Sequence, residues 1–466
     1  MKERKRKIFI YSVDGVGHLN ASIGLGQALL NRGHEIYFLC TLMFVDMIKK
    51  YGFKEIVLTT KLHEQANNDN KSDDDGEEEK KNAHPIQSID MMIKTLQQVG
   101  ILSDVRPIDK LKIFDSTRDD SIGTHMYNET IEIHQQFVDA IQREQPDLII
   151  LDTMLVDPFI AFGQIPWAFS LSANPTFLLT NHPDIPPACS GLPSNDRTEW
   201  AEFLDEFNRT FKKDMRYFQN KLNQHYGYPE SSDDNFLVHS PYLNFYGYPK
   251  ELDYTDIIGK MPDNFIRLDA FCRQESEPFQ LPEEFQSKLK PDDKLIYLSL
   301  GSYGSMDVLL MKRLVEALSK TPYKYIVSKG ALHQQYELAD NMWGQAFLPQ
   351  IRILPLVDMV ITHGGNNTVT ESILFGKPML VIPLFADQFD NAQRIKEKGF
   401  GDRIEAYRFE HDQLIAMIDK IINDNDIRER CRKAAQRISV DDSKIKACEQ
   451  IEKFLDDFSS SSPANA

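Results

Sequence analysis

The sequence predicts an α/β protein of two domains, each with a parallel sheet covered by helices. At 466 residues the chain is too long for one ordinary hydrophobic core. Short apolar runs alternate with helical patterns near the N-terminus, and the same alternation starts again after residue 293. This alternation is typical of parallel strands joined by crossover helices.

In the first half, residues 7–12 predict a buried strand, followed by a turn with glycines at 13–17. A helix with an apolar stripe is expected from 18 to about 31, and a second strand at 35–40. Further strands are expected at 147–151 and 166–171.

Two segments of this half do not fit the alternation. Residues 64–84 are polar and charged, so they cannot offset the entropy lost on ordering, and we expect a mobile surface insertion. Residues 174–194 are rich in proline and predict an irregular loop.

The second half repeats the pattern with strands expected at 295–300, 323–328, 360–362 and 379–382 and helices at 308–318 and 368–375. Between 242 and 293 prolines and charges rise, which indicates a linker. The expected division is 1–241 for the N-terminal domain, 242–293 for the linker, 294–445 for the C-terminal domain, and 446–466 for a terminal helix that could pack on the first domain, with a disordered tail.

Composition excludes several classes of function. The net charge of −17 argues against a nucleic-acid or anionic-membrane partner. The five cysteines are scattered, which argues against a zinc site or a disulfide framework and fits a reducing compartment. No apolar run approaches the roughly 20 residues that span a bilayer. We therefore expect a cytoplasmic monomer without a membrane anchor.

Polar residues follow the strands in both halves. In the first half these are His18 and Asp152; in the second they are Ser302, Ser328, His363 and the pair Asp387 and Gln388. Ligands of open α/β sheets bind beyond the carboxyl ends of the strands. The sequence therefore predicts a ligand cleft between the two domains.

The ordered series that starts at Phe347-Leu348-Pro349-Gln350 carries a resemblance to a known family. It continues with His363-x-Gly365-x-Asn367-Thr368-x-x-Glu371, then Pro378, Pro383 and Asp387-Gln388. This series resembles the donor-binding signature of the family 1 UDP-dependent glycosyltransferases, in the soluble form of plant and bacterial members. The resemblance implies the GT-B fold, with two facing Rossmann-like domains. The second domain would hold a UDP-sugar and the first the acceptor.

The resemblance also implies roles for the donor side. His363 would donate to the diphosphate, Gln350 would face the uracil, and Phe347 would stack where many members carry tryptophan. Glu371 would hold the ribose, and Asp387 with Gln388 would bind the sugar, with glutamine favouring glucose. The expected donor-binding residues are Ser302, Ser328, Phe347, Gln350, His363, Gly365, Asn367, Thr368, Glu371, Asp387 and Gln388. Local chemistry leaves an alternative open, because Thr368 and Glu371 match a helix capping box and Asn367 could be an N-cap.

The expected catalytic residues are His18 and Asp152. Transfer to a hydroxyl needs a base near neutral pH, and a carboxylate would fix the tautomer of the histidine. Asp157 is the competing carboxylate, but the strand end favours Asp152. Asp14, if close, would raise the pKa of His18.

The sequence thus predicts an inverting UDP-glucosyltransferase that uses no metal or cofactor and acts on a small hydrophobic or phenolic acceptor of flavonoid or xenobiotic type, as in detoxification. The expected acceptor contacts are Met91, Phe114, Met126 and Asn174, in loops 85–130 and 172–195. Two alternatives remain, a UDP-sugar epimerase of the same fold and a non-catalytic nucleotide-sugar binding protein. A dehydrogenase is disfavoured because the turn before His18 lacks the third glycine of the dinucleotide fingerprint.

Overall fold

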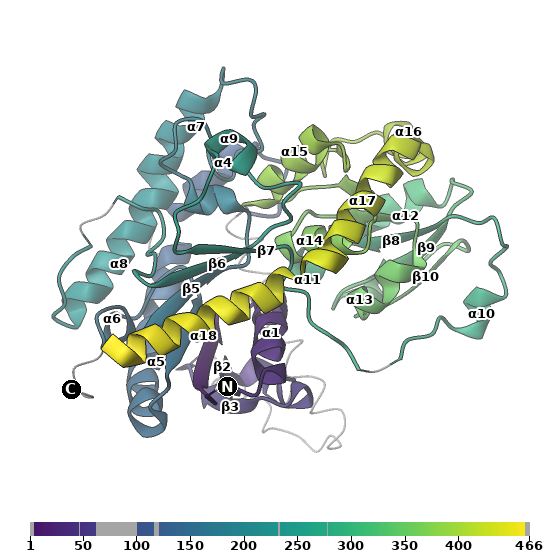
Figure 1. Cartoon of the computed structure of the whole chain (residues 1–466). Helices are drawn as coiled ribbons and strands as arrows, with labels where there is room; N and C mark the ends of the chain where they lie inside the picture. Colours follow the sequence, from purple (N-terminus) through teal and green to yellow (C-terminus); the bar gives the residue numbers. More distant parts are fainter. Residues whose placement is uncertain are drawn as a thin grey trace, which may run out of the picture.

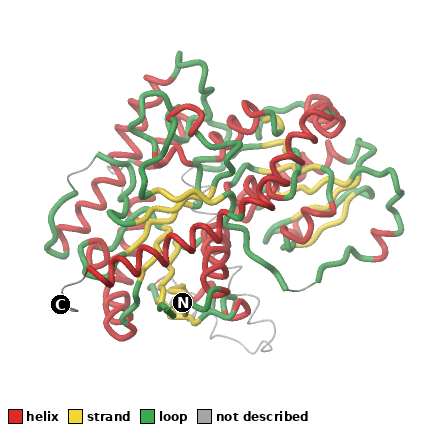
Figure 2. Tube along the Cα trace, in the orientation of Figure 1, coloured by secondary structure: helices red, strands yellow, loops and turns green. Residues whose placement is uncertain are grey.

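The structure is a computed structural model of the chain. It describes residues 4–45, 47–61, 100–115, 121–231, 234–276 and 278–461. The predicted insertion at 64–84 and the predicted acceptor contact Met91 lie outside the described residues. Figure 2 shows the strands in two separate groups with helices around each, as the alternation in the sequence predicts.

The first sheet has the strand order β3-β2-β1-β4-β5-β6-β7, and every pairing is parallel. Its strands are β1 (Lys7–Ser12), β2 (Glu35–Thr41), β3 (Lys54–Leu58), β4 (Leu148–Asp152), β5 (Trp167–Leu171), β6 (Leu243–Gly247) and β7 (Phe265–Leu268). The central strands are buried on both faces, which explains why they read as continuous apolar runs. The main helices of this half are α1 (Val16–Asn31), α5 (Ile122–Glu144), α7 (Trp200–Phe207) and α8 (Lys213–His225).

The second sheet is also parallel, with the order β10-β9-β8-β11-β12-β13. Its strands are β8 (Leu295–Ser299), β9 (Lys324–Ser328), β10 (Met342–Gln345), β11 (Met359–Thr362), β12 (Met379–Val381) and β13 (Gly401–Arg403). Its main helices are α12 (Val308–Leu318), α14 (Asn366–Leu374), α15 (Gln388–Lys398), α16 (His411–Asn423) and α17 (Asn425–Asp441). Shorter helical segments include α4 (Pro107–Lys110), α6 (Pro158–Ala161), α9 (Thr255–Ile258), α10 (Glu283–Gln286), α11 (Gly301–Gly304) and α13 (Gln350–Ile353).

The predicted linker at 242–293 begins too early. β6 and β7 fall inside this range, yet both pair within the first sheet, where Phe245 and Leu268 are fully buried. The segment has many prolines because its connections are irregular, and this composition concealed two short strands. The connection between the sheets therefore begins after β7.

The chain returns to the first domain at its C-terminal end. Helix α18 (Ser443–Ser461) follows α17 and lies against α1 and β7 (Figure 1). Its residues Ala447, Cys448, Ile451 and Leu455 are buried in the core on that face of the first sheet. Glu452 also forms an ion pair with Arg32 of α1.

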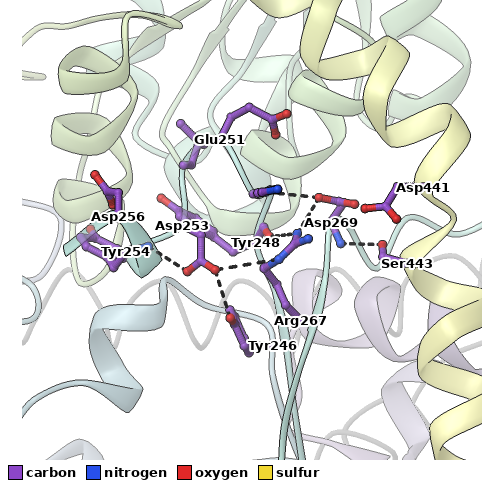
Figure 3. A network of polar contacts seen from close by, with 12 residues as sticks. Tyr246, Tyr248, Glu251, Asp253, Tyr254, Asp256, Arg267, Asp269, Asp441 and Ser443 are labelled. Atoms are coloured by element: carbon purple, nitrogen blue, oxygen red, sulfur yellow. Dashed lines mark hydrogen bonds and ion pairs between the residues drawn. The ribbon is translucent and has the colours of Figure 1, made fainter. Parts of the chain in front are cut away.

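A polar network ties α17 to the segment around β7. The Arg437 guanidinium donates to Glu251 at 2.6 Å and to Asp269 at 2.7 Å. Asp269 is 1% exposed, and it also accepts from Arg267 at 2.6 Å. Burial opposes ionisation of Asp269, but these two guanidinium groups lower its pKa to about 2. Figure 3 shows Glu251, Arg267 and Asp269 converging between strand and helix, so the network joins the second half of the chain to the first.

Candidate active site

His18 lies in the first turn of α1, directly after the loop that follows β1. Its Nδ1 is 3.1 Å from Oδ2 of Asp152, and its side chain is 40% exposed. Asp152 ends β4 and pairs in register with Ser12 at the end of β1. The two neighbouring strand ends therefore bring the predicted histidine and carboxylate into contact.

Asp157, the competing carboxylate, has a different role. It caps α6 by accepting from the backbone N–H of Phe159 at 2.9 Å. It also lies 2.7 Å from Nδ1 of His134. The Asp157 carboxylate therefore interacts with α6 and α5, and Asp152 is the carboxylate that contacts His18.

The pKa of His18 is raised. Burial lowers it, but the charge and hydrogen bond of Asp152 and the charge of Asp387 together outweigh burial. Asp14 accepts hydrogen bonds from Thr41 Oγ1 at 2.8 and 2.9 Å, and burial raises its own pKa to about 6. The shift of His18 therefore arises from Asp152 and Asp387, not from Asp14 as the sequence suggested.

Ser172 joins this pair, and sequence reasoning missed it. Its hydroxyl donates to Oδ2 of Asp152 at 2.6 Å and lies 2.8 Å from Nδ1 of His18. It stands one residue past β5, the strand beside β4. Its position beyond a strand end is the signal that could have found it.

His363 stands between β11 and α14, and its ring is enclosed by two glycines. A Cβ atom at Gly301 would lie 2.7 Å from this ring, and one at Gly365 would lie 2.4 Å from its Nε2. Burial lowers the pKa of His363 to about 4. The ring is therefore neutral at pH 7 and can donate one hydrogen bond, but it carries no charge in the free protein.

Helix α14 starts two residues earlier than predicted, with Gly365 as its N-cap and no side-chain cap. Thr368 and Glu371 consequently lie inside the helix, so the capping-box alternative is wrong. Asn367 is not the N-cap either, since it is the second helical residue and its amide donates to the backbone oxygen of Gly17 in α1. The N–H groups of this first turn remain a favourable position for an anion.

The buried Glu371 and the half-buried Gln350 form a polar pair in the predicted nucleotide site. Gln350 Nε2 donates to Oε2 of Glu371 at 2.6 Å and lies 3.3 Å from the hydroxyl of Thr368. Arg273, from the connection after β7, lies 3.7 Å from the other carboxylate oxygen. Burial raises the pKa of Glu371, against the opposing effects of Arg273 and Gln350.

Three other predicted donor residues lie at or just beyond the carboxyl ends of strands of the second sheet. Phe347 follows β10 and is 55% exposed, which leaves its ring accessible to a base. Ser302 belongs to the short helix α11 after β8, and Ser328 ends β9. Ser302 and Ser328 thus lie at the ends of two strands that pair with one another.

Asp387 and Gln388 form the start of α15. Oδ2 of Asp387 accepts from the backbone N–H of Asn174, in the first domain, at 2.9 Å. Burial raises the pKa of Asp387 to about 6. Gln388 Oε1 accepts from the N–H groups of Leu384 and Phe385 at 3.0 and 3.2 Å, so this oxygen already has two hydrogen-bond donors in the turn before α15.

Three of the predicted acceptor contacts, Phe114, Met126 and Asn174, lie within the described residues. Phe114 is buried in the core, stacked on Phe211 with ring centroids 3.6 Å apart. Met126 is half-buried on α5 and packs against the same core. Asn174 is fully buried, and its amide donates to Tyr248 and to Asn391. Asn174 is thus an interdomain residue, and its prediction as an acceptor contact was wrong.

Two further features are absent from the described residues. Among them, no cluster of three or more histidine, cysteine or acidic side chains has a geometry that could hold a metal ion. No helix in the described part of the chain is long and apolar enough to cross a membrane.

Known proteins resemble this chain in sequence. Residues 262–440 match the family model described as UDP-glucoronosyl and UDP-glucosyl transferase. The NDP-glycosyltransferase YjiC of Bacillus subtilis (strain 168) is 22% identical over 97% of this chain and 98% of its own length. The chain therefore resembles the family 1 UDP-glycosyltransferases.

Other similarities support this glycosyltransferase assignment. The human UDP-glucuronosyltransferase 1A9 is 31% identical over 183 residues, which are 38% of this chain and 33% of the human protein. The crystal structure of CalG4, the calicheamicin glycosyltransferase, superposes with a TM-score of 0.64 at 17% identity, covering 97% of this chain and 99% of CalG4. The glycosyltransferase therefore has the GT-B fold, as predicted.

Proposed function

We propose that this glycosyltransferase is an inverting enzyme that transfers glucose from UDP-glucose to a hydroxyl of a small lipophilic or phenolic acceptor. The acceptor O–H bond breaks and its proton passes to Nε2 of His18. The acceptor oxygen then attacks the anomeric carbon from the face opposite UDP, and UDP leaves with the electron pair of the broken C–O bond. One displacement of this kind inverts the anomeric configuration.

The contact between His18 and Asp152 carries this proposal. Nδ1 of His18 lies 3.1 Å from a carboxylate that is 4% exposed, so the carboxylate favours the tautomer with hydrogen on Nδ1. Nε2 is then free to accept a proton, as a general base requires. The raised pKa of His18 shifts upward, relative to an ordinary histidine, the pH range in which this base is unprotonated.

The second domain supplies groups suited to the leaving UDP. The first turn of α14 presents backbone N–H groups, and the neutral ring of His363 lies directly before it. Such preorganised donors stabilise charge that develops on a diphosphate. We assign this role to His363, Gly365 and Ser302.

A UDP donor is favoured by the position of Glu371. A carboxylate can accept from both hydroxyls of a ribose, whereas a deoxyribose offers only one of them. In the free protein Gln350 occupies one oxygen of Glu371, and a bound ribose would compete for it. The open ring of Phe347 is suited to stack on uracil.

Glucose is the proposed sugar because a glutamine after the aspartate, as in Asp387-Gln388, favours glucose in the family that this chain resembles. Similar proteins carry names that specify glucuronosyl transfer or only an NDP donor. The experiment must therefore compare donors. Purified protein is incubated with a library of phenolic and other lipophilic hydroxyl compounds together with UDP-glucose, UDP-glucuronic acid or dTDP-glucose, and products are identified by mass spectrometry.

The proposal predicts an acceptor mass increased by one hexose residue, with UDP released only when acceptor is present. Consumption of UDP-glucose without acceptor would indicate the alternative epimerase. Binding of UDP without product from any acceptor would indicate a nucleotide-sugar binding protein.

A further inference from the structure

The hydroxyl of Ser172 lies between His18 and Asp152, closer to each than they are to one another. Its Oγ is 2.8 Å from Nδ1 of His18 and 2.6 Å from Oδ2 of Asp152, whereas the direct contact is 3.1 Å. Both distances through the hydroxyl are at the short end of normal hydrogen bonds. Ser172 is 8% exposed, so little water competes for these contacts.

The direction of each hydrogen bond follows from the groups themselves. An ionised carboxylate only accepts, so the single proton of Ser172 is donated to Asp152. The lone pairs of Oγ are then left to accept from Nδ1–H of His18. This arrangement requires the tautomer in which Nε2 carries no proton.

We propose that Ser172 is a positioning residue that connects His18 to Asp152 through its hydroxyl and so holds the imidazole in the orientation of a base. The inference rests on the proposed function of His18. No proton moves along this chain during the reaction. The acceptor proton remains on Nε2, and the imidazolium is stabilised through the polarised Ser172 hydroxyl, because short hydrogen bonds in series strengthen one another.

The backbone is held in place both before and after Ser172. β5 ends at Leu171, directly before it, and is paired with β4 and β6 in the middle of the sheet. Two residues beyond it, the N–H of Asn174 donates to Asp387 of the second domain. The hydroxyl is therefore held by a central strand on one side and by the contact between the domains on the other.

The test compares three variants of Ser172. Ser172→Cys nearly keeps the shape of the side chain but is a weak hydrogen-bond donor, and Ser172→Ala removes the group. Both should lower kcat by roughly tenfold to a hundredfold, part of what a general base contributes, while KM for UDP-glucose stays within about twofold. Ser172→Thr keeps a hydroxyl and should restore most of kcat. Ser170→Ala, which removes another buried hydroxyl of β5, is the matched control and should keep normal kcat.

A double-mutant cycle with Asp152→Asn separates positioning from a merely structural role. If Ser172 acts through Asp152, Ser172→Ala should change kcat by less than about twofold in the Asp152→Asn background. Equal losses in both backgrounds, or normal kcat in Ser172→Cys, would overturn the inference. His18→Ala is measured in the same assays. If His18→Ala loses turnover but Ser172→Cys keeps a normal kcat, only the role of Ser172 is rejected. If His18→Ala keeps normal turnover, the proposed function itself is rejected.

Discussion

The carboxylate of Asp387 in the second domain accepts a hydrogen bond from the backbone N–H of Asn174 in the first, 2.9 Å away. The same carboxylate contributes to the raised pKa of His18. The proposed sugar-binding end of the donor site and the proposed base therefore face one another across the contact between the domains.

Replacing Asp387 should weaken donor binding. Asp387→Ala removes the proposed acceptor for sugar hydroxyls, and a hydrogen bond to a charged group is worth about 1.5–3 kcal/mol. We expect kcat/KM for UDP-glucose to fall by roughly tenfold to a hundredfold in steady-state assays. Thr176→Val is the control, because it breaks another interdomain hydrogen bond, to Asp390 at 3.0 Å, without touching Asp387. Equal losses in both variants would show that Asp387 acts only by joining the domains.

The ring of Phe347 should set the affinity for the base. Phe347→Ala should weaken UDP binding measured by calorimetry by about 1–3 kcal/mol, the usual contribution of one stacked base. Phe347→Trp should tighten it, since a larger ring covers more of the base. The exposed Leu356→Ala is the control and should bind UDP normally. Unchanged UDP affinity in Phe347→Ala would remove this residue from the site.

Asp390 should make stability depend on pH. It is 4% exposed and accepts from the N–H groups of Cys189 and Gly191 at 2.7 and 2.9 Å. Burial raises its pKa to about 7 from the ordinary value of 3.8. The folded protein therefore binds this proton more tightly than the unfolded chain does. The resulting stabilisation is fully present below about pH 4 and is lost as the pH rises through about 7.

Denaturant melts between about pH 5 and 8 test this assignment. The free energy of unfolding of the wild type should fall with rising pH, and Asp390→Asn should make that slope shallower. Asp263→Asn is the control, because Lys260 lowers the pKa of this exposed carboxyl and its titration lies below the range. An identical slope in Asp390→Asn and the wild type would contradict the assignment.

Arg437 should stabilise the join between the two halves of the chain. Arg437→Met leaves Glu251 and the buried Asp269 without this partner. Breaking a buried pair costs about 3–5 kcal/mol, and partial exposure of the guanidinium reduces the expected loss to about 1–3 kcal/mol. Chemical denaturation measures this loss in the free energy of unfolding. Arg432→Met, on the same helix, breaks an exposed ion pair with Glu429 and should change stability little, so a similar loss in both would refute the role of the network.

The sequence predicted the features that follow from strand order. Polar residues at the carboxyl ends of neighbouring parallel strands lie at the same end of the sheet. His18 follows β1 and Asp152 ends β4, so their contact could be expected from their positions in the sequence. The sequence left the role of Glu371 open because Thr368 and Glu371 also fit a capping box, and the start of α14 at Asn366 excludes that box.

Contacts between the domains could not be predicted. Asn174 stands in a proline-rich loop that resembled an acceptor loop, but its partners Asp387 and Asn391 lie more than two hundred residues away, at α15 of the second domain. Hydrophobic periodicity in the sequence indicates which face of a helix is buried, but it does not indicate which element packs against that face. For the same reason the short strands β6 and β7 were hidden among the prolines of the expected linker.

Turnover by His18→Ala is the most direct measurement of whether His18 is the base. We expect kcat with UDP-glucose and an acceptor that the wild type glucosylates to fall by roughly a hundredfold or more, because the base is lost, while UDP binding stays near normal. Turnover equal to that of the wild type would contradict the assignment of His18 as the base.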